Sequence, residues 1–166
     1  MIRIAMQSDV VAMADIYEEA IRDQVHANCD TSQPDLAKFA RGYFFGNGRY
    51  TTLINETDDR CVVGWGALKR FSALPWDDSV AEVAVYIRRG HRSRGTGVRL
   101  LQALVAHAEA AKFYSVVAII LSENVPSIRG CYACGFECGV KMPSIASLYG
   151  ATEDVVWMQK LLTRES

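Results

Sequence analysis

A turn rich in small residues, placed between an apolar run and an amphipathic run, constrains this sequence more than any other feature. Residues 92–97 read Arg-Ser-Arg-Gly-Thr-Gly, after the apolar segment 80–87 and before the helical pattern of 98–112. This order predicts a strand, a glycine-bearing turn and a helix. Small residues let backbone N–H groups converge at a helix start, where the macrodipole favours an anion. Since Arg92 and Arg94 add positive charge, we expect the turn to hold phosphates.

Two common phosphate-binding motifs do not fit this turn. A P-loop requires Lys and then Ser or Thr after its last glycine, but Gly97 is followed by Val98 and Arg99. A dinucleotide fingerprint requires a third glycine where Leu100 stands, and an acidic residue near position 115, which is missing. The pattern that remains is Arg-x-x-Gly-x-Gly. A tight turn with two solvated arginines would show the same pattern, so the rest of the chain has to decide.

Composition excludes several classes of protein. The 166 residues fit a single domain, residues 1–166, and the formal net charge of −1 argues against a nucleic-acid partner. No apolar run approaches the length of a membrane span, and residues 1–9 lack the apolar core of a signal peptide. Five cysteines, an odd number, fit free thiols in a reducing compartment. We therefore expect a cytoplasmic protein with no membrane partner.

Hydrophobic periodicity predicts an alternation of strands and helices. Helices are expected over residues 9–25 (with Ser8 as the N-cap), 34–45, 98–112 and 124–134. Strands are expected over residues 1–6, 50–55, 61–71, 80–87, 114–121, 136–140 and 153–162, with an irregular segment at 141–152. This order indicates an α/β fold, with a mixed sheet of about seven strands and helices on both faces.

A second motif makes a family resemblance specific. Residues 124–136 run from an asparagine through a short helical pattern to Gly-Phe, and they resemble a segment of the GNAT acetyltransferase superfamily. The turn at 92–97 resembles the pyrophosphate loop of the same superfamily. Residues 15–21, Glu82 and residues 154–159 add a likeness to the phosphinothricin/methionine sulfoximine N-acetyltransferase branch. The resemblance covers nearly the whole chain and implies a single GNAT domain with a mixed, mostly antiparallel sheet.

The resemblance also implies acetyl-CoA as the co-substrate, with no metal. Backbone groups of Val85, Tyr86 and Ile87 would hold the pantetheine arm like an added strand. Asn124 would hydrogen-bond the cofactor near its thioester. The pyrophosphate would lie on the turn, whose candidate residues are Arg92, Ser93, Arg94, Gly95, Thr96, Gly97 and Val98.

Acetyl transfer to an amine requires a base. An amine with a pKa near 10 is only about 0.1 % neutral at pH 7, so its proton has to be removed before attack. Glu82 is the candidate, because a carboxylate on an apolar central strand is costly without a task or a partner. A glutamate at a solvated edge is the simpler interpretation. Tyr86, on the same face, would orient Glu82 or the substrate, or would only pack in the core.

The proton donor to the departing thiolate is left open. Many members of the superfamily place a tyrosine four residues before the closing glycine, and this position is Cys131 here. Tyr132 follows one residue later, about 100° around the helix. Cys131, Tyr132 and the absence of any side-chain acid are the three alternatives.

The cysteine spacing has a second possible meaning. Cys131, Cys134 and Cys138 are spaced like ligands, but the three histidines of the chain are scattered. We therefore expect small buried thiols at a junction of helix and strand, with no metal site.

The substrate is expected to be a small, amino-acid-like amine. Basic residues that the branch carries before the central strand are replaced by Ser72 and Leu74, while Lys69 and Arg70 lie slightly earlier. The pocket lining would instead include Trp76, Asp77 and Asp78. Direct transfer in a ternary complex is expected, and the resemblance to the branch implies a homodimer. The alternatives are a protein or peptide N-acetyltransferase and a catalytically inactive acyl-CoA-binding module.

Overall fold

One sheet of seven strands forms the frame of the fold, in the spatial order β1-β2-β3-β4-β5-β7-β6. The computed structural model describes the chain apart from residues 24, 26–34, 45–47, 73–77, 149–150 and 163–166. The strands are β1 (Ile2–Ile4), β2 (Thr51–Glu56), β3 (Val62–Arg70), β4 (Val80–Ile87), β5 (Ser115–Leu121), β6 (Glu137–Leu148) and β7 (Ala151–Leu161). The helices are α1 (Val10–Arg22), α2 (Leu36–Tyr43), α3 (Thr96–Ala110) and α4 (Val125–Ala133), with 3₁₀ turns η1 (Gln7–Asp9) and η3 (Arg89–His91).

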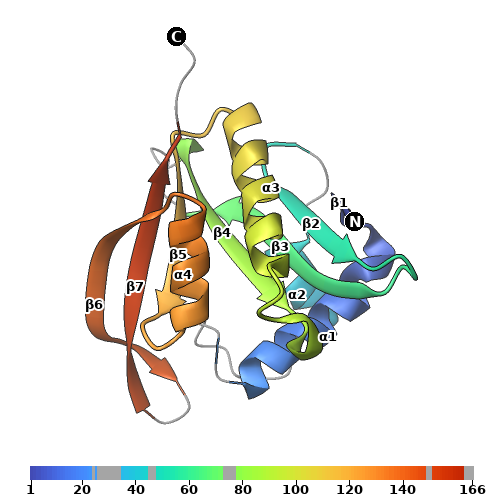
Figure 1. Cartoon of the computed structure of the whole chain (residues 1–166), viewed down its shortest axis with the longest axis horizontal. Coiled ribbons are helices and arrows are strands. Elements are labelled where there is room, and N and C mark those ends of the chain that lie inside the picture. The colour runs from blue at the N-terminus through green and yellow to red at the C-terminus, as the bar shows by residue number, and fades with distance from the viewer. Residues whose placement is uncertain (24, 26–34, 45–47, 73–77, 149–150, 163–166) are drawn as a thin grey trace.

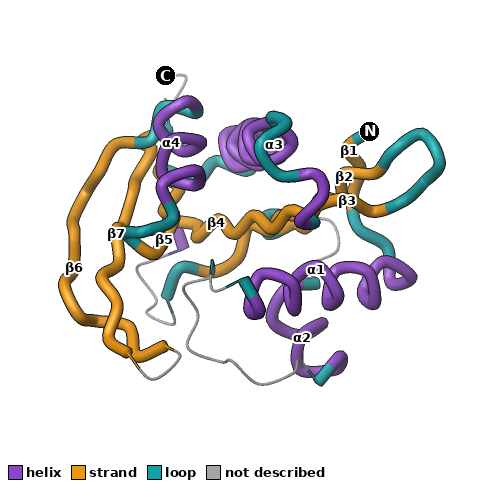
Figure 2. The backbone as a smooth tube through the Cα atoms, turned by 60° about the horizontal axis from the view of Figure 1, so that its bottom comes forward, coloured by secondary structure: helices purple, strands orange, loops and turns teal. Residues whose placement is uncertain are grey.

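Helices cover both faces of the sheet. α3 and α4 lie on one face, and α1 and α2 lie on the other (Figure 1, Figure 2). Neighbouring strands are antiparallel, except β4 and β5, which run parallel. The prediction of an α/β fold with a mixed, mostly antiparallel seven-stranded sheet is therefore confirmed. Within the described part of the chain, no helix is long and apolar enough to cross a membrane.

The segment 141–152 corrects one expectation, because β6 continues through it as far as Leu148. Pairing of β6 with β7 shifts register twice, after Cys138 and again after Met142. Each shift interrupts the alternation of inward and outward side chains by which a strand is identified in a sequence. Pro143, which lies within the second shift, also argues against a strand when the sequence is read alone.

Close contact between α3 and the sheet depends on glycine in β3. Leu100 and Leu104 of α3 are fully buried against the sheet. A Cβ atom on Gly66 would lie 2.7 Å from Leu104 Cδ1 and 3.0 Å from the Ala84 carbonyl oxygen, closer than side chains tolerate. The absent side chain lets the helix that follows the phosphate turn lie directly on the centre of the sheet.

The opposite face is built from aromatic side chains. Trp65 of β3 is fully buried, and its Nε1–H donates to the Met13 carbonyl of α1 at 3.0 Å. Tyr86 of β4 packs on Trp65 with ring centroids 4.6 Å apart, and Tyr17 of α1 meets Tyr86 at 5.2 Å. The aromatic layer therefore fixes α1 against the central strands, on the face of the sheet that also carries Glu82.

An ion network closes the N-terminal end of the molecule. At the entry to α1, the side chain that accepts a backbone hydrogen bond is that of Asp9, and not that of Ser8 as expected. The Asp9 carboxylate accepts the Met6 N–H at 2.7 Å. Arg3 of β1 donates two hydrogen bonds to Asp9, at 2.7 and 2.9 Å, and one to Glu56 of β2 at 2.9 Å. The Arg3 guanidinium holds the pKa of Asp9 below its usual range, through hydrogen bonding against the opposing effect of burial.

Replacing Arg3 with methionine would leave two buried carboxylates without their cation. We expect Arg3→Met to lower the free energy of unfolding by about 3 kcal/mol at pH 7. Because the folded-state pKa of Asp9 is depressed, its contribution is present above about pH 4 and is lost as the pH falls below that. Urea denaturation across the pH range tests this, and a deficit that stays constant down to pH 3 would contradict it.

Candidate functional site

The parallel strands β4 and β5 separate part-way along their length. Registered pairing ends at Val83 and Ala118, although β4 continues to Ile87 and β5 to Leu121. The unpaired part of β4 is about four residues, or roughly 13 Å at the rise of a strand. A gap bordered by strand edges therefore opens inside the sheet.

Backbone groups of alternate β4 residues are directed into this gap. The Arg88 N–H donates to the Val63 carbonyl at 2.9 Å, so these opposed residues form a hydrogen-bonded antiparallel pair. Such pairs recur at every second residue, which directs the N–H and C=O of Tyr86 toward β3. The groups of Val85 and Ile87 point the other way, into the gap. Tyr86 is thus not a backbone donor to a ligand there, contrary to the expectation from sequence.

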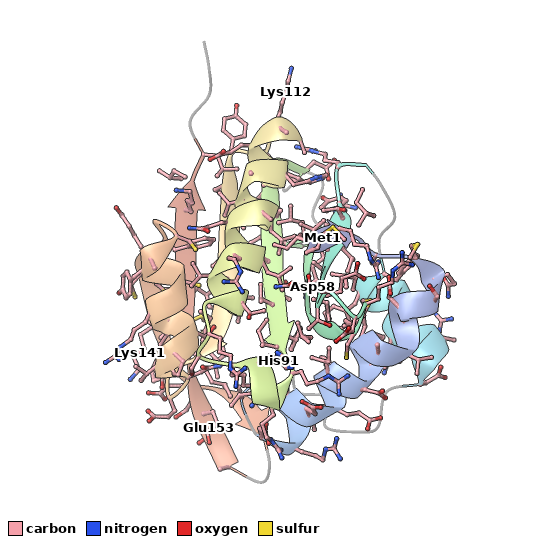
Figure 3. The ribbon with its side chains drawn as sticks, turned by 45° about the vertical axis from the view of Figure 1, so that its right-hand side comes forward. Met1, Asp58, His91, Lys112, Lys141 and Glu153 are labelled. Atoms are coloured by element: carbon pink, nitrogen blue, oxygen red, sulfur yellow. The ribbon has the colours of Figure 1, made fainter. Side chains whose placement is uncertain are left out.

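The turn before α3 concentrates backbone N–H groups next to the gap. It begins after His91, labelled in Figure 3, beside the C-terminal end of α1. Ser93 and Gly95 adopt positive φ angles of 58° and 75°, and Gly95 is the N-cap residue of the 15-residue helix α3. Left-handed residues next to a helix start form a concave nest of N–H groups that binds anions. The predicted phosphate turn therefore has the required geometry.

The C-terminal end of α1 braces this turn. Asp23 accepts hydrogen bonds from both Arg89 and Arg92, and the Arg92 Nε–H also donates to the Ile87 carbonyl at 2.9 Å. Hydrogen bonding from Arg89 first, and from Arg92 in addition, lowers the pKa of Asp23. Arg92 thus supports the turn and the end of β4, and part of its charge is already balanced before any anion binds.

A cavity of about 470 Å³ fills the gap. Its walls include Ala20 of α1 on one face of the sheet and Leu101 of α3 on the other, so it passes through the split sheet. Among the residues expected from the sequence, those lining it are Glu82, Val85, Tyr86, Ile87, Arg92, Ser93, Gly95, Gly97, Val98, Asn124 and Cys131. Arg94, Thr96 and Tyr132 do not line it.

Glu82 enters this cavity from the α1 and α2 side. Its carboxylate is 14 % exposed, and Oε1 lies 2.8 Å from Nζ of Lys69, the residue directly opposite on β3. The partner explains how a carboxylate is tolerated on a central strand. Of the basic pair noted in the sequence, Lys69 reaches the site, whereas Arg70 pairs with the exposed Asp78. Trp76 and Asp77, expected to line the pocket, lie outside the described residues.

The hydroxyl groups beside Glu82 are those of neutral tyrosines. Burial raises the pKa of Tyr43 and of Tyr86 above the ordinary value, and the hydroxyl groups of Tyr17 and Tyr86 hydrogen-bond with Tyr43. The negative charge of Glu82 acts on Tyr86 in the same direction. Tyr43 and Tyr86 therefore keep their protons near neutral pH and do not serve as bases.

Asn124 lines the cavity, and its side chain already makes two hydrogen bonds within the protein. Its Nδ2 donates to the Val25 carbonyl at 3.0 Å, and its Oδ1 accepts the Ser127 N–H at 3.2 Å as the N-cap of α4. Asn124 therefore connects the start of α4 to Val25, in the segment that follows α1. A bond to a cofactor would use the second Nδ2 hydrogen or the second lone pair of Oδ1.

The two candidates for the proton donor differ in position. Cys131 is buried in the cavity wall, and burial raises the pKa of its thiol to about 12. Tyr132 is 53 % exposed and lies outside the lining, because the next residue of a helix points about 100° away. Cys134 is half-buried and Cys138 exposed, which corrects the expectation of three buried thiols. Among the described residues, no cluster of three His, Cys, Asp or Glu side chains could hold a metal ion.

Some residues of the site were not identified from the sequence. Glu19 accepts from the Arg88 side chain at 3.1 Å and from the Arg89 N–H at 2.8 Å, so it braces the same segment as Asp23. Glu19 and Asp23 are four residues apart on α1, a spacing that puts both carboxylates on one face. The two carboxylates on one helix face, together with the basic segment 88–94, were the signal in the sequence for these ion pairs.

A sheet split between two parallel strands, with an anion nest beside the gap, is the arrangement expected of an acyltransferase that uses a phosphate-bearing acyl carrier. A family model described as "Acetyltransferase (GNAT) family" matches residues 13–136. The chain belongs to this family, and it is an acetyl-CoA-dependent N-acetyltransferase.

Relatives agree over nearly the full length of the chain. An L-methionine sulfoximine/L-methionine sulfone acetyltransferase of Pseudomonas paraeruginosa is 30% identical over 160 residues, which are 95% of this chain and 92% of the relative. The L-amino acid N-acyltransferase MnaT of Escherichia coli is 27% identical over 95% of this chain and 91% of its own. The structure of yncA from Salmonella typhimurium with its cofactor acetyl-CoA superposes with a TM-score of 0.87, at 26% identity, over 100% of this chain and 95% of that one.

The residues of this chain fit acetyl-CoA. The nest at Ser93 and Gly95 suits a pyrophosphate, and the gap edge at Val85 and Ile87 suits an extended arm that carries amide groups. The cavity of about 470 Å³ lies within the range of small-molecule sites.

A charged side chain at the nest should abolish this fit. We expect Gly95→Glu to weaken acetyl-CoA binding by at least ~100-fold. The new carboxylate would repel the phosphates, and a side chain at this positive φ would strain the backbone of the nest. The matched control is Gly90→Glu, which places the same charge at an exposed glycine of η3 with open space around it. Titration calorimetry measures both, and retained binding in Gly95→Glu would refute the assignment of the turn.

Proposed function

We propose that this chain transfers the acetyl group of acetyl-CoA to the α-amino group of a small amino-acid-like substrate, with Glu82 as the proton acceptor. The observation that carries the proposal is the placement of Glu82. It lines the same cavity as the gap edge of β4 and the phosphate nest, three residues before Val85 on the same strand. The proposal treats residues 1–166 as one catalytic domain.

Each part of the site has a separate task in this proposal. Acetyl-CoA supplies an acetyl group activated as a thioester. Val85 and Ile87 position its arm along β4, and the nest at Ser93 and Gly95 fixes its phosphates. The acceptor approaches from the α1 and α2 face, where Glu82 lies. Because the cavity passes through the sheet, the two substrates meet without sharing an entrance.

Glu82 would accept the proton that makes the amine nucleophilic. An ammonium group attracted to this carboxylate gives up one proton, directly or through a water molecule. The freed lone pair then forms the N–C bond to the acetyl carbon as the C–S bond breaks. A second proton from the nitrogen goes to the leaving sulfur or to solvent, so the products are an amide and free CoA. No covalent bond to the protein is required.

Cys131 would line the cavity without acting as the acid. Its pKa of about 12 lies roughly three units above that of an ordinary thiol. A thiol whose pKa is raised by burial is a weaker acid than an ordinary thiol, so proton transfer from Cys131 to a departing thiolate is disfavoured. We therefore assign the leaving group its proton from the amine or from water, the third alternative left by the sequence.

The choice of an amino-acid substrate is supported by two relatives. The Pseudomonas relative is named for methionine sulfoximine and methionine sulfone, and the Escherichia coli relative for L-amino acids. All of these acceptors carry an α-amino group beside a carboxylate. Assembly as a homodimer and a cytoplasmic location stay predictions from the sequence.

Removing the carboxylate should remove catalysis while leaving cofactor binding. We expect Glu82→Gln to lower kcat/KM by roughly 10²–10⁴-fold with acetyl-CoA affinity within a factor of three. Free-thiol detection of released CoA measures the rate across a panel of methionine sulfoximine, phosphinothricin, free amino acids, polyamines and short peptides. A blank without amine corrects for the five cysteines of the protein.

The control variant is Glu109→Gln, which changes an exposed glutamate of α3 in the same way. Undiminished turnover in Glu82→Gln would exclude Glu82 as the base. Turnover of peptides alone would favour a peptide N-acetyltransferase. Binding of acetyl-CoA with no turnover of any amine would favour an inactive binding module.

A further inference from the structure

We propose that Lys69 is the residue that selects a carboxylate-bearing substrate, by binding the α-carboxylate while Glu82 binds the adjacent ammonium group. The inference rests on the proposed function and deepens it, because it assigns the half of the substrate that Glu82 does not recognise. The Lys69–Glu82 pair would be a receptor for a zwitterion.

The two side chains form a compact dipole on one face of the sheet. Lys69 and Glu82 are opposed in the β3–β4 register, and Nζ of the lysine lies 2.8 Å from Oε1 of the glutamate. Their side chains are 19 % and 14 % exposed, so both are sheltered but reachable. Glu82 lines the cavity, and Lys69, which is not itself a lining residue, is connected to the cavity through this ion pair.

The charges of this pair match those of an α-amino acid at neutral pH. The ammonium and carboxylate groups of an amino acid are separated by a single carbon atom, so both can reach adjacent charges of opposite sign. Placed against the pair in the opposite sense, the zwitterion brings its ammonium to Glu82 and its carboxylate to Lys69. Each charge then gains a partner in a partly desolvated site, where Coulomb attraction is stronger than in water.

The surroundings of Lys69 leave its ammonium group capacity for a second partner. Nζ lies 5.6 Å from the centroid of the Tyr43 ring, which supports the cation without supplying an acceptor. An ammonium group has three donors, and one of them suffices for Glu82. A guanidinium in the same position would be larger and would favour a bidentate bond to the carboxylate of Glu82 itself.

The proposal predicts which amines the enzyme prefers. A zwitterionic amino acid should bind better than its carboxamide, which keeps the ammonium but has no negative charge. Polyamines present a second cation to Lys69 and should be poor acceptors. The net charge of the pair is zero, so selection depends on the position of the two charges and not on overall attraction.

The test compares one amino acid with its own carboxamide in wild type and in Lys69→Met, using the best acceptor of the panel. We expect Lys69→Met to raise KM for the acid by ~30-fold and KM for the amide by less than threefold. Any general effect of leaving Glu82 unpaired acts on both acceptors and cancels in their ratio. Lys69→Arg, which keeps the charge, should restore part of the preference.

The control is Arg70→Met, which removes the neighbouring cation from its exposed pair with Asp78. It should leave the ratio of acid to amide unchanged. An equal ratio of acid KM to amide KM in wild type and Lys69→Met would overturn the proposal. A wild-type enzyme with the same KM for acid and amide would also overturn it, and that result needs no variant. If wild type acetylates peptides but no amino acid or amide, the proposed function fails first and the inference fails with it.

Discussion

The loss of pairing between β4 and β5 beyond Val83 is the constraint on which the rest of the structure depends. Strand edges inside a sheet normally satisfy each other, and here two of them face a cavity of about 470 Å³ instead. The backbone groups of Val85 and Ile87 thereby face the cavity, where the Ile87 carbonyl also accepts the Arg92 Nε–H. In the proposed binding mode, an acyl carrier with amide groups along its arm would complete the sheet through the same hydrogen bonds that hold ordinary strands together.

The elements around the split position the side chains and backbone groups that line it. On one side, the glycines of β3 bring α3 close to the sheet, so the helix start faces the gap. On the other, Asp23 of α1 holds Arg89 and Arg92 beneath the phosphate turn, and Asn124 connects α4 to the segment that follows α1. Glu82 and Lys69 form their ion pair where β4 is still paired on both sides, at the closed end of the gap, which is where the proposal places the acceptor.

Sequence reasoning identified the elements whose signals are local. The run 80–87, apolar except for Glu82, predicted the bounds of β4, and Asn124 and Gly135 lie at the ends of α4 as expected. The Lys69–Glu82 pair could not be foreseen, since cross-strand register depends on the length and path of the connection between β3 and β4. The rotation of α4, which buries Cys131 and exposes Tyr132, is likewise fixed by packing and not by spacing.

Residue-resolved hydrogen exchange with and without acetyl-CoA tests the central claim most directly. If the cofactor completes the split sheet, the N–H groups of Val85 and Ile87 should become protected at least tenfold on binding. The Tyr86 N–H, already bonded to β3, should change little and serves as the internal reference. Saturating acetyl-CoA that protects the turn around Gly95 but leaves Val85 and Ile87 unchanged would contradict the account, because the arm would then lie elsewhere.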